Sequence, residues 1–385
     1  MKKLTAVDLF SGAGGLSIGI ERAGFEVILA NEIEKDFAKT YSLNHPNTKI
    51  LNCDIHTVDF TCELSTLGIE IGAIDLLCGG PPCQGFSTVG SKNKKDPRNS
   101  LFYEFIRATI EIKPKYILFE NVSGFKKMYN GEAYKTVLNE LKELGYNSIS
   151  SVLEASDYGL PQNRQRTIIL GWRNECIPLS FPEITHFQEI NLFGGSKKLC
   201  LMDAISDLPP LGFNDEKHFY FCSPQNNYQK KLRGNETVLT EHNSSDYGEK
   251  MKKILKLVPE GGTVDDLPEY LRPKNYFKNT YSRLLPYQPS PTITRNFGTP
   301  SSSRCIHPFQ PRALSTREGA RLQGFPDSYK FFGSKTSKNL QIGNAVPPIF
   351  GEVIANEIVN KIIYNNKTKI IDNYATSVSH LVGVS

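Results

Sequence analysis

One cysteine stands in a segment whose residue types could present it as a nucleophile. Residues 74–78 form an apolar run that predicts a buried strand, and it ends in Gly79-Gly80 followed by Pro81-Pro82-Cys83-Gln84-Gly85-Phe86-Ser87. The prolines fix φ before Cys83 and Gly85 lets the chain turn after it, so the thiol is expected on a stiff loop. A free cysteine is more often a buried structural residue, but this loop argues against burial in a regular element.

The beginning of the chain has the pattern of a βαβ nucleotide-binding unit. A strand, a glycine turn, a helix and a second strand are predicted over residues 5–9, 10–15, 16–23 and 27–30. Glu32 follows the second strand, 20 residues after Gly12, where a ribose-binding carboxylate belongs. The glycine spacing Gly-x-Gly-Gly differs from a dinucleotide phosphate cradle. We therefore expect a cofactor without phosphates that stacks on Phe10, with an ordinary strand-to-helix turn as the alternative.

Carboxylates follow two further predicted strands. Glu120 comes directly after the apolar strand 116–119, and strand ends of open α/β sheets are where ligands bind. We expect Glu120 beside Cys83 as a general acid, the alternative being a cap for the next helix. Asp54 is a weaker candidate for reading a cofactor base, since an Asp at a strand end is commonly a turn or helix cap.

Basic residues flank these candidates. Arg164 and Arg166 precede the strand 167–171 at i and i+2, so they should point the same way and could together hold a base oxygen or a phosphate. A surface ion-pair ladder is the competing interpretation. The polar segment 90–98 could close over a phosphate backbone, although its composition equally fits a solvated loop.

Composition restricts the class of protein. With 385 residues the chain should form one large domain and a smaller one, and 39% apolar with 22% charged residues are typical of a soluble globular protein. No membrane span or signal peptide is predicted, so we expect a cytoplasmic protein. Eight cysteines without a Cys-x-x-Cys pair indicate neither a metal site nor a disulfide framework.

The net charge of +5 is concentrated in one segment. Between residues 187 and 312 there are 17 Lys/Arg against 13 Asp/Glu, in turn-rich sequence without a zinc-finger or helix-turn-helix pattern. We interpret 187–312 as a smaller, irregular domain that binds a target through loops, and 1–186 with 313–385 as the sheet domain. Arg295 and Arg304 are candidate nucleic-acid contacts; a merely solvated basic surface is the alternative.

Six strings occur in the order seen in DNA (cytosine-5) methyltransferases, and the chain resembles a bacterial, restriction-modification member over nearly its whole length. These are residues 8–15 (DLFSGAGG), 80–87 (GPPCQGFS), 120–122 (ENV), 162–166 (QNRQR), 317–326 (REGARLQGFP) and 341–346 (QIGNAV). The resemblance implies a Rossmann-like α/β S-adenosylmethionine-dependent methyltransferase sheet with a second, smaller irregular target-recognition domain.

The resemblance also implies site residues. Phe10 would contact the adenine of S-adenosylmethionine, Glu32 would bind the ribose, and Asp54 would bind the amine of the adenine. Ile33 would stack on the adenine at a position where the family often has a larger side chain. The remaining residues implied for the cofactor pocket are Gly12, Gly14, Ile55, Pro81, Leu101, Asn344 and Val346. DNA contacts are expected from Gln84, next to Cys83, and from Ser87 and Arg98, which bound the 87–98 loop. This loop would act as a lid.

The chemistry follows from the poor nucleophilicity of cytosine carbon 5. Addition of the Cys83 thiolate to carbon 6 makes the ring an enamine, which is covalent catalysis. Glu120 would donate a proton to ring nitrogen 3, while Arg164 and Arg166 hold the ring oxygen and the nearby phosphate. Because these carbons lie within the duplex stack, the target base must be flipped out.

The leading interpretation is therefore a sequence-specific DNA cytosine-5 methyltransferase acting on double-stranded DNA, monomeric, and paired with a cognate restriction endonuclease. A transfer-RNA cytosine-5 methyltransferase of similar architecture is one alternative, disfavoured by the length of the second domain. A catalytically silent DNA-binding regulator is another, disfavoured by intact Cys83, Glu120, Arg164 and Arg166.

Overall fold

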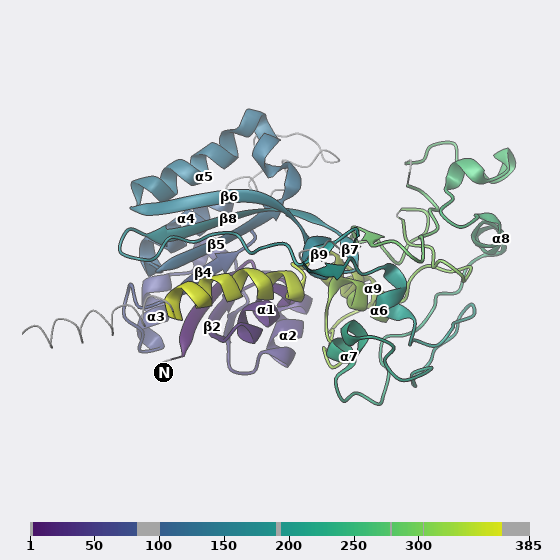
Figure 1. The fold of residues 1–385 in the computed structure, drawn as a ribbon, viewed down its shortest axis with the longest axis horizontal. Helices are drawn as coiled ribbons and strands as arrows, with labels where there is room; N and C mark the ends of the chain where they lie inside the picture. Colours follow the sequence, from purple (N-terminus) through teal and green to yellow (C-terminus); the bar gives the residue numbers. More distant parts are fainter. Residues whose placement is uncertain (1–2, 83–100, 190–193, 278, 303, 364–385) are drawn as a thin grey trace, which may run out of the picture.

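The protein has two lobes that lie side by side (Figure 1). The computed structural model describes residues 3–82, 101–189, 194–277, 279–302 and 304–363. The first lobe is a three-layer α/β sandwich and the second consists of short helices and long loops.

The first lobe is built on a seven-stranded sheet with the order β3-β2-β1-β4-β5-β8-β6. β8 is antiparallel to both of its neighbours, and the strand pairs on the β3-to-β5 side are parallel. The strands are β1 (Leu4–Leu9), β2 (Phe25–Asn31), β3 (Lys49–Leu51), β4 (Leu76–Gly79), β5 (Tyr116–Val122), β6 (Tyr146–Glu154) and β8 (Gln165–Arg173). This arrangement confirms the predicted Rossmann-like α/β sheet.

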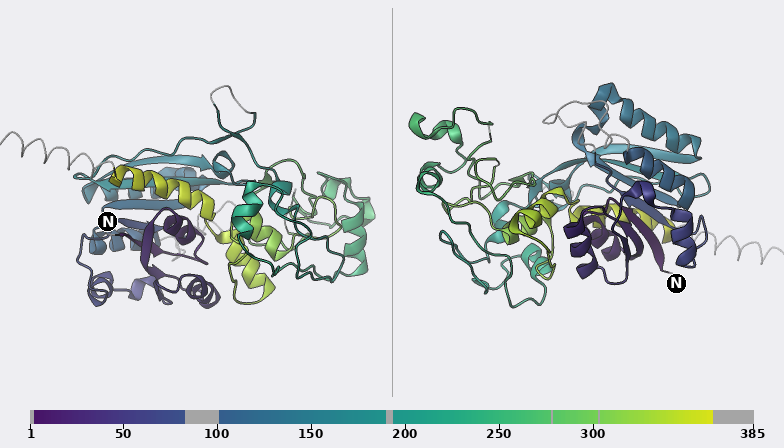
Figure 2. Two further views of the ribbon diagram at one scale, coloured as in Figure 1. Left: turned by 60° about the horizontal axis from the view of Figure 1, so that its bottom comes forward. Right: turned by 180° about the vertical axis from the view of Figure 1, so that it is seen from behind.

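Helices cover both faces of the sheet. One hydrophobic core joins the sheet to α3 (Phe60–Thr66), α4 (Leu101–Ile112) and α5 (Glu132–Glu143). A second core joins the other face to α1 (Gly15–Arg22) and to a C-terminal helix over residues 348–363. In Figure 1 this helix is the yellow one in front of the sheet, and Figure 2 gives the view from behind. The α2 helix (Lys35–Asn44) follows β2.

Glycines let the C-terminal helix pack closely against α1. A β-carbon at Gly19 would lie 2.4 Å from the carbonyl oxygen of Pro348, and one at Gly15 would lie 2.4 Å from that of Val346. Both separations are shorter than any side chain tolerates, so these positions require glycine. The start of the C-terminal helix is thereby held against α1.

The second lobe contains short elements around its own core. Its helices are α6 (Leu201–Ile205), α7 (Asn227–Arg233), α8 (Glu249–Leu257), α9 (Thr316–Gln323) and α10 (Lys335–Asn344), with short 3₁₀ turns η6 (Val264–Asp266) and η7 (Glu269–Leu271). Two-residue strands pair near the junction of the lobes: β7 (Gln162–Asn163) with β11 (Ser290–Pro291), and β9 (His186–Phe187) with β10 (Ser196–Lys197).

The segment after residue 312 packs in two places. Apolar side chains of α9 and α10 share one core with α6 and α7, which also includes Ile18 of α1 and Ile349, whereas Phe350 and the residues after it pack on the sheet. This core therefore reaches across the junction of the two lobes. The division of the chain into 1–186 with 313–385 and 187–312 stays a prediction.

Buried ion pairs fix α9 inside the second lobe. Arg321 lies 2.8 Å from Asp207 and 2.6 Å from Asp327, and Arg312 makes two contacts of 2.7 Å with Glu318. All five side chains are at most 6% exposed. Each buried charge thus has an oppositely charged partner, which is the condition for tolerating charge in a protein interior.

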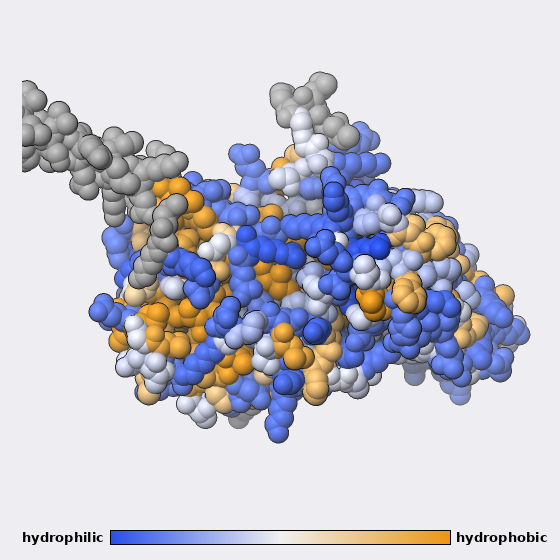
Figure 3. Space-filling view, turned by 90° about the horizontal axis from the view of Figure 1, so that it is seen from below, coloured by the Kyte–Doolittle hydropathy of each residue, from blue (hydrophilic) through white to orange (hydrophobic). Residues whose placement is uncertain are grey.

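The surface of the molecule is mixed in polarity. In Figure 3 hydrophilic residues cover much of the second lobe, with scattered apolar patches between them. Within the described part of the chain no helix is long and apolar enough to cross a membrane. Among the same residues no group of three His, Cys, Asp or Glu side chains could hold a metal ion.

Candidate active site

The ends of four neighbouring strands bring the acidic candidates to one edge of the sheet. Leu9 of β1 pairs with Asn31 of β2 and with Gly79 of β4, and Gly79 pairs with Phe119 of β5. Glu32 and Glu120 therefore lie on the same edge as the segment that leads to Cys83. This confirms the predicted convergence, because parallel strands place their carboxyl ends together.

Glu32 is held rigidly between two backbone amides. Its Oε2 accepts a hydrogen bond from Gly12 N–H and its Oε1 accepts one from Glu34 N–H, each at 2.8 Å. The side chain is buried, and burial raises its pKa above the ordinary value although the two amides oppose this shift. Each carboxylate oxygen keeps a second lone pair, so Glu32 can still accept hydrogen bonds from a ligand.

Two of the residues near Glu32, Ile33 and Asp54, have exposed side chains, one apolar and one acidic. Ile33 exposes 59% of its surface, which is unusual for a large apolar side chain next to a buried carboxylate. The Asp54 side chain is half exposed, caps a short turn by accepting from His56 N–H, and contacts His56 Nδ1 at 2.7 Å. Ile55 is different, because its side chain is buried in the core; only its backbone can face a ligand.

Phe10 begins the glycine loop in an unusual conformation. Its φ of 55° lies in the left-handed region, which non-glycine residues adopt rarely and most often at functional sites. A β-carbon at Gly12 would meet no atom within 4 Å, so the backbone there borders open space. The loop thus exposes its main chain beside a half-buried aromatic ring.

Asp8 lies beneath this loop in a buried network. Its Oδ2 accepts from the Ser17 hydroxyl at 2.6 Å, and Ser17 in turn lies 2.7 Å from the Tyr41 hydroxyl. Burial raises the pKa of Asp8 to about 7. The residue stabilises the start of α1 and is not exposed to a ligand.

Glu120 and Arg166 form the centre of the candidate catalytic site. Glu120 Oε1 lies 2.7 Å from Arg166 Nε, and both side chains are largely buried. A β-carbon at Gly80 would lie 2.7 Å from the other carboxylate oxygen, Oε2. The second oxygen therefore faces the segment that leads into the cysteine loop, and Gly80 leaves room for it.

Asn121 is a site residue to which the sequence interpretation gave no role. Its side-chain amide donates to the carbonyl of Pro81 at 3.0 Å and is buried. The residue after the general-acid candidate thus anchors the start of the cysteine loop. Cys83 itself lies outside the described residues, as do Gln84, Ser87 and Arg98.

Arg164 lies near Arg166 and Glu120 but has other hydrogen-bond partners. Its guanidinium donates to the carbonyls of Ile293, Gly343 and Ala345 at 2.8–3.2 Å, and the side chain is 1% exposed. The contacts of Arg164 in this structure are therefore with backbone at the junction of the lobes, and the substrate roles of the two arginines stay predictions. Arg164 joins the sheet domain to the second lobe.

The remaining cofactor and DNA candidates lie at the junction or on the surface. Leu101 is half-buried at the start of α4, Asn344 is exposed at the end of α10, and Val346 is half-buried beside α1. The backbone of Arg295 packs directly on Gly343, at 2.4 Å from the position of a β-carbon, so its side chain starts close to Asn344. Arg295 and Arg304 are both exposed.

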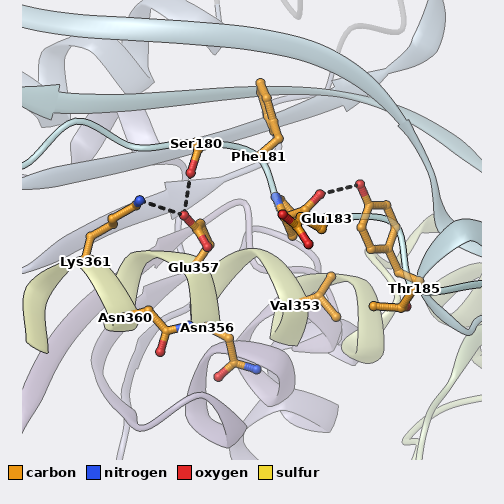
Figure 4. Close-up of a pocket in the computed structure, with 11 residues that line it drawn as sticks. Ser180, Phe181, Glu183, Thr185, Val353, Asn356, Glu357, Asn360 and Lys361 are labelled. Carbon is orange, nitrogen blue, oxygen red and sulfur yellow. Dashed lines mark hydrogen bonds and ion pairs between the residues drawn. The ribbon is translucent and has the colours of Figure 1, made fainter. Parts of the chain in front are cut away.

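A surface pocket of about 620 Å³ lies elsewhere, between the C-terminal helix and the segment 180–185 (Figure 4). Glu357, its central carboxylate, accepts from the Ser180 hydroxyl at 2.6 Å and lies 3.5 Å from Lys361 Nζ. None of the strand-end candidates lines this pocket. We therefore assign the chemistry to the sheet edge.

The sheet order, its single antiparallel strand and the acidic strand ends define a Rossmann-like methyltransferase. The C-5 cytosine-specific DNA methylase family matches residues 4–360. The chain belongs to this family, and it is a DNA (cytosine-5) methyltransferase.

Related proteins agree with this assignment. The chain is 35% identical to the type II methyltransferase M.DdeI of Desulfomicrobium norvegicum over 92% of this chain and 88% of that protein. It is 34% identical to M.Eco47II of Escherichia coli over 94% of this chain and 80% of the other. A solved structure of a DNA modification methyltransferase encoded within an E. coli prophage superposes with a TM-score of 0.74 at 28% identity, covering 93% of this chain and 99% of that one.

A more distant likeness concerns the fold alone. Spodoptera frugiperda DNMT2 superposes with a TM-score of 0.59 at 19% identity, over 92% of this chain and 99% of that chain. The fold thus extends beyond the bacterial relatives.

Proposed function

We propose that this methyltransferase recognises a short sequence in double-stranded DNA, methylates one cytosine through a covalent adduct with Cys83, and protects DNA in a restriction-modification system. The observation that carries the mechanism is the geometry of Glu120, with Oε1 on Arg166 and Oε2 toward Gly80. The type II methyltransferases among its relatives support the biological role.

The loop from Phe10 to Gly14 and the Glu32 carboxylate fit S-adenosylmethionine. A buried carboxylate with a spare lone pair on each oxygen suits a ribose diol, and the exposed Ile33 offers an apolar face for a purine. Asp54 would accept from the adenine amine and Phe10 would stack on the ring. When bound, the cofactor supplies the methyl group; the protein residues bind and orient it. Leu101, Asn344 and Val346 would line the rest of the pocket.

The residues at the end of β5 would activate the cytosine. The Cys83 thiolate adds to carbon 6, the ring electrons move toward carbon 5 and nitrogen 3, and Glu120 Oε2 supplies the proton at nitrogen 3. Arg166 holds Oε1 and therefore the orientation of the carboxyl group. After carbon 5 has received the methyl group, a base removes the carbon-5 proton, and the electrons of that bond form the double bond between carbons 5 and 6. The bond between sulfur and carbon 6 breaks, which restores the thiolate, and the proton on nitrogen 3 returns to Glu120.

The neighbouring contacts support this placement of the loop. Asn121, which follows Glu120 in the chain, donates a hydrogen bond to the carbonyl of Pro81. Pro81 is two residues before Cys83. Positioning of a nucleophile within a few tenths of an ångström of its target accounts for a large part of enzymatic rate enhancement. Gln84, Ser87 and Arg98 are proposed to contact the DNA around the flipped base.

The second lobe would read the DNA sequence through loops. Arg295 and Arg304 are exposed on it and are proposed as DNA contacts. We further propose that the enzyme acts as a monomer in the cytoplasm, where it has access to genomic DNA, together with a cognate endonuclease.

Methylation mapping tests this proposal. The purified protein is incubated with labelled S-adenosylmethionine and unmethylated bacterial DNA, and the product is analysed as nucleosides and at base resolution. We expect 5-methylcytosine in one short motif. Label in N4-methylcytosine or N6-methyladenine would overturn the mechanism, and label in transfer RNA but not in DNA would overturn the substrate assignment.

A further inference from the structure

A tyrosine of the second lobe reaches the glycine loop of the first. Tyr329 is 5% exposed and packs its ring against Phe325 and Phe331, with centroids 5.0 and 5.4 Å away, in the core of the second lobe. Its hydroxyl donates a hydrogen bond to the backbone carbonyl of Ala13. Ala13 lies between Gly12, whose N–H donates to Glu32, and Gly14, the N-cap residue of α1.

His45 and Glu21 fix this hydroxyl from the other side. His45 Nε2 lies 3.1 Å from the Tyr329 hydroxyl, and Nδ1 lies 2.9 and 3.0 Å from the two carboxylate oxygens of Glu21. The Ala13 carbonyl receives the hydroxyl hydrogen of Tyr329, and the Glu21 carboxylate holds the His45 ring at Nδ1. The position of the imidazole ring beside the hydroxyl is thereby fixed.

The loop is in direct contact with these side chains. A β-carbon at Gly14 would lie 2.6 Å from His45 Nε2 and 2.7 Å from the Tyr329 hydroxyl. The φ of Gly14 is +86°, a conformation that favours glycine. Because no side chain separates the loop from His45 and Tyr329, the position of the loop backbone depends on both.

The segment that carries Tyr329 is itself bound to α2. Lys330 N–H donates to Asn44 Oδ1 at 2.9 Å, and the Asn44 amide donates back to the Lys330 carbonyl at 2.9 Å. Phe332 N–H donates to the Thr40 hydroxyl at 2.8 Å. Tyr329 is therefore held in place relative to α2, which begins three residues after Glu32.

We propose that Tyr329 is a positioning residue for the cofactor: it holds the Ala13 carbonyl so that Gly12 and Glu32 stay in the geometry that binds S-adenosylmethionine. The affinity for the cofactor is thereby coupled to the docking of the second lobe. This inference rests on the proposed function, which assigns the loop to the cofactor.

The test is Tyr329→Phe, which removes only the hydroxyl. Tyr228→Phe is the matched control, because Tyr228 is also buried in the core of the second lobe and donates to a backbone carbonyl, that of Arg321, at 2.7 Å. Binding of S-adenosylmethionine to the full chain is measured by calorimetry. In Tyr329→Phe the loss of one buried hydrogen bond to the loop should raise the Kd for S-adenosylmethionine about 5- to 10-fold. Tyr228→Phe should bind the cofactor as the wild type does.

Two further readouts separate positioning from general destabilisation. Amide hydrogen exchange of residues 10–16 should become faster in Tyr329→Phe only, and kcat at saturating cofactor should change less than KM for the cofactor. Unchanged affinity and exchange in Tyr329→Phe, with Glu32→Gln still weakening binding, would overturn the inference and leave the cofactor site intact. A wild-type protein that does not bind S-adenosylmethionine would overturn the proposed function itself, and the inference with it.

Discussion

Glu120 and Arg166 face each other across two antiparallel strands, with 2.7 Å between Oε1 and Nε. Glu120 of β5 pairs with Ile168 of β8, and Arg166 pairs with Val122. The two residues are therefore diagonal neighbours, two positions out of register, which places their side chains on the same face of the sheet. The ion pair fixes one carboxylate oxygen and directs the other toward Gly80 and the cysteine loop.

Gly80→Ala should abolish activity without unfolding the protein. The new β-carbon would lie 2.7 Å from Glu120 Oε2, so the carboxyl group or the loop must move. We expect kcat to fall at least about 100-fold, the effect of misplacing a catalytic group, with the thermal midpoint within a few degrees of the wild type. Gly248→Ala is the control, since a β-carbon there meets no atom within 4 Å. Retained activity in Gly80→Ala would contradict the assigned orientation of Glu120.

Lysine at positions 164 and 166 should have different effects. Arg164→Lys loses the forked donors to three buried carbonyls, so the free energy of unfolding should fall by about 2–4 kcal/mol. Arg166→Lys keeps the charge but loses the Nε contact with Glu120, so kcat should fall at least about 10-fold with little change in stability. Urea unfolding and steady-state kinetics of both variants give the comparison. The reverse pattern would show that Arg164, and not Arg166, serves the substrate.

Glu32→Gln should weaken cofactor binding selectively. The carboxamide would place an NH₂ group against either Gly12 N–H or Glu34 N–H, where both oxygens now accept at 2.8 Å. At about 1–3 kcal/mol for a buried donor without an acceptor, the Kd for S-adenosylmethionine should rise about 5- to 150-fold. Glu34→Gln, which removes a neighbouring exposed charge, should bind normally. Equal effects of the two substitutions would point to net charge as the cause.

Asp8 should make the protein less stable as the pH rises toward neutrality. Burial raises the pKa of Asp8 to about 7, while in the unfolded chain it is about 4. Between these values the unfolded chain releases a proton that the folded chain keeps, so the free energy of unfolding decreases as the pH rises from about 4 to about 7.

Asp8→Asn removes this titration, and the difference in unfolding free energy between wild type and variant should change across that window. Chemical unfolding at a series of pH values measures it. Asp54→Asn serves as a control, because hydrogen bonds from His56 lower the pKa of Asp54 and its titration therefore lies below this pH window, where the difference from wild type should stay constant. Parallel pH curves for wild type and Asp8→Asn would contradict the burial of a titrating carboxyl group.

Local sequence was sufficient to predict the sheet and the edge at which the acidic strand ends lie. Apolar runs followed directly by Glu32, Gly80 or Glu120 contain both the strand and its end, and parallel strands bring such ends together. The predicted helix at 16–23 differs from the structure by one residue at each end, because apolar periodicity is a local signal.

Contacts between distant segments could not be predicted in the same way. The burial of Arg164 depends on carbonyls of residues 293, 343 and 345, and the role of Tyr329 depends on Ala13, 316 positions away. The local sequence around Arg164 does not distinguish it from a surface arginine, and the local sequence around Tyr329 does not distinguish it from an ordinary core tyrosine. The core that α9 joins could not be predicted for the same reason, since the amphipathic pattern of a helix does not say which core it packs in.

The most direct test of the account is a covalent trap at Cys83. DNA containing 5-fluorocytosine at the mapped target is incubated with the enzyme and S-adenosylmethionine; fluorine at carbon 5 cannot leave as a proton does, so an adduct at carbon 6 should persist. We predict a complex that survives denaturation, with the DNA attached to the peptide containing Cys83, and no such complex for Cys83→Ser. A peptide attached through another residue, or 5-methylcytosine formed by Cys83→Ser on ordinary DNA, would contradict the mechanism.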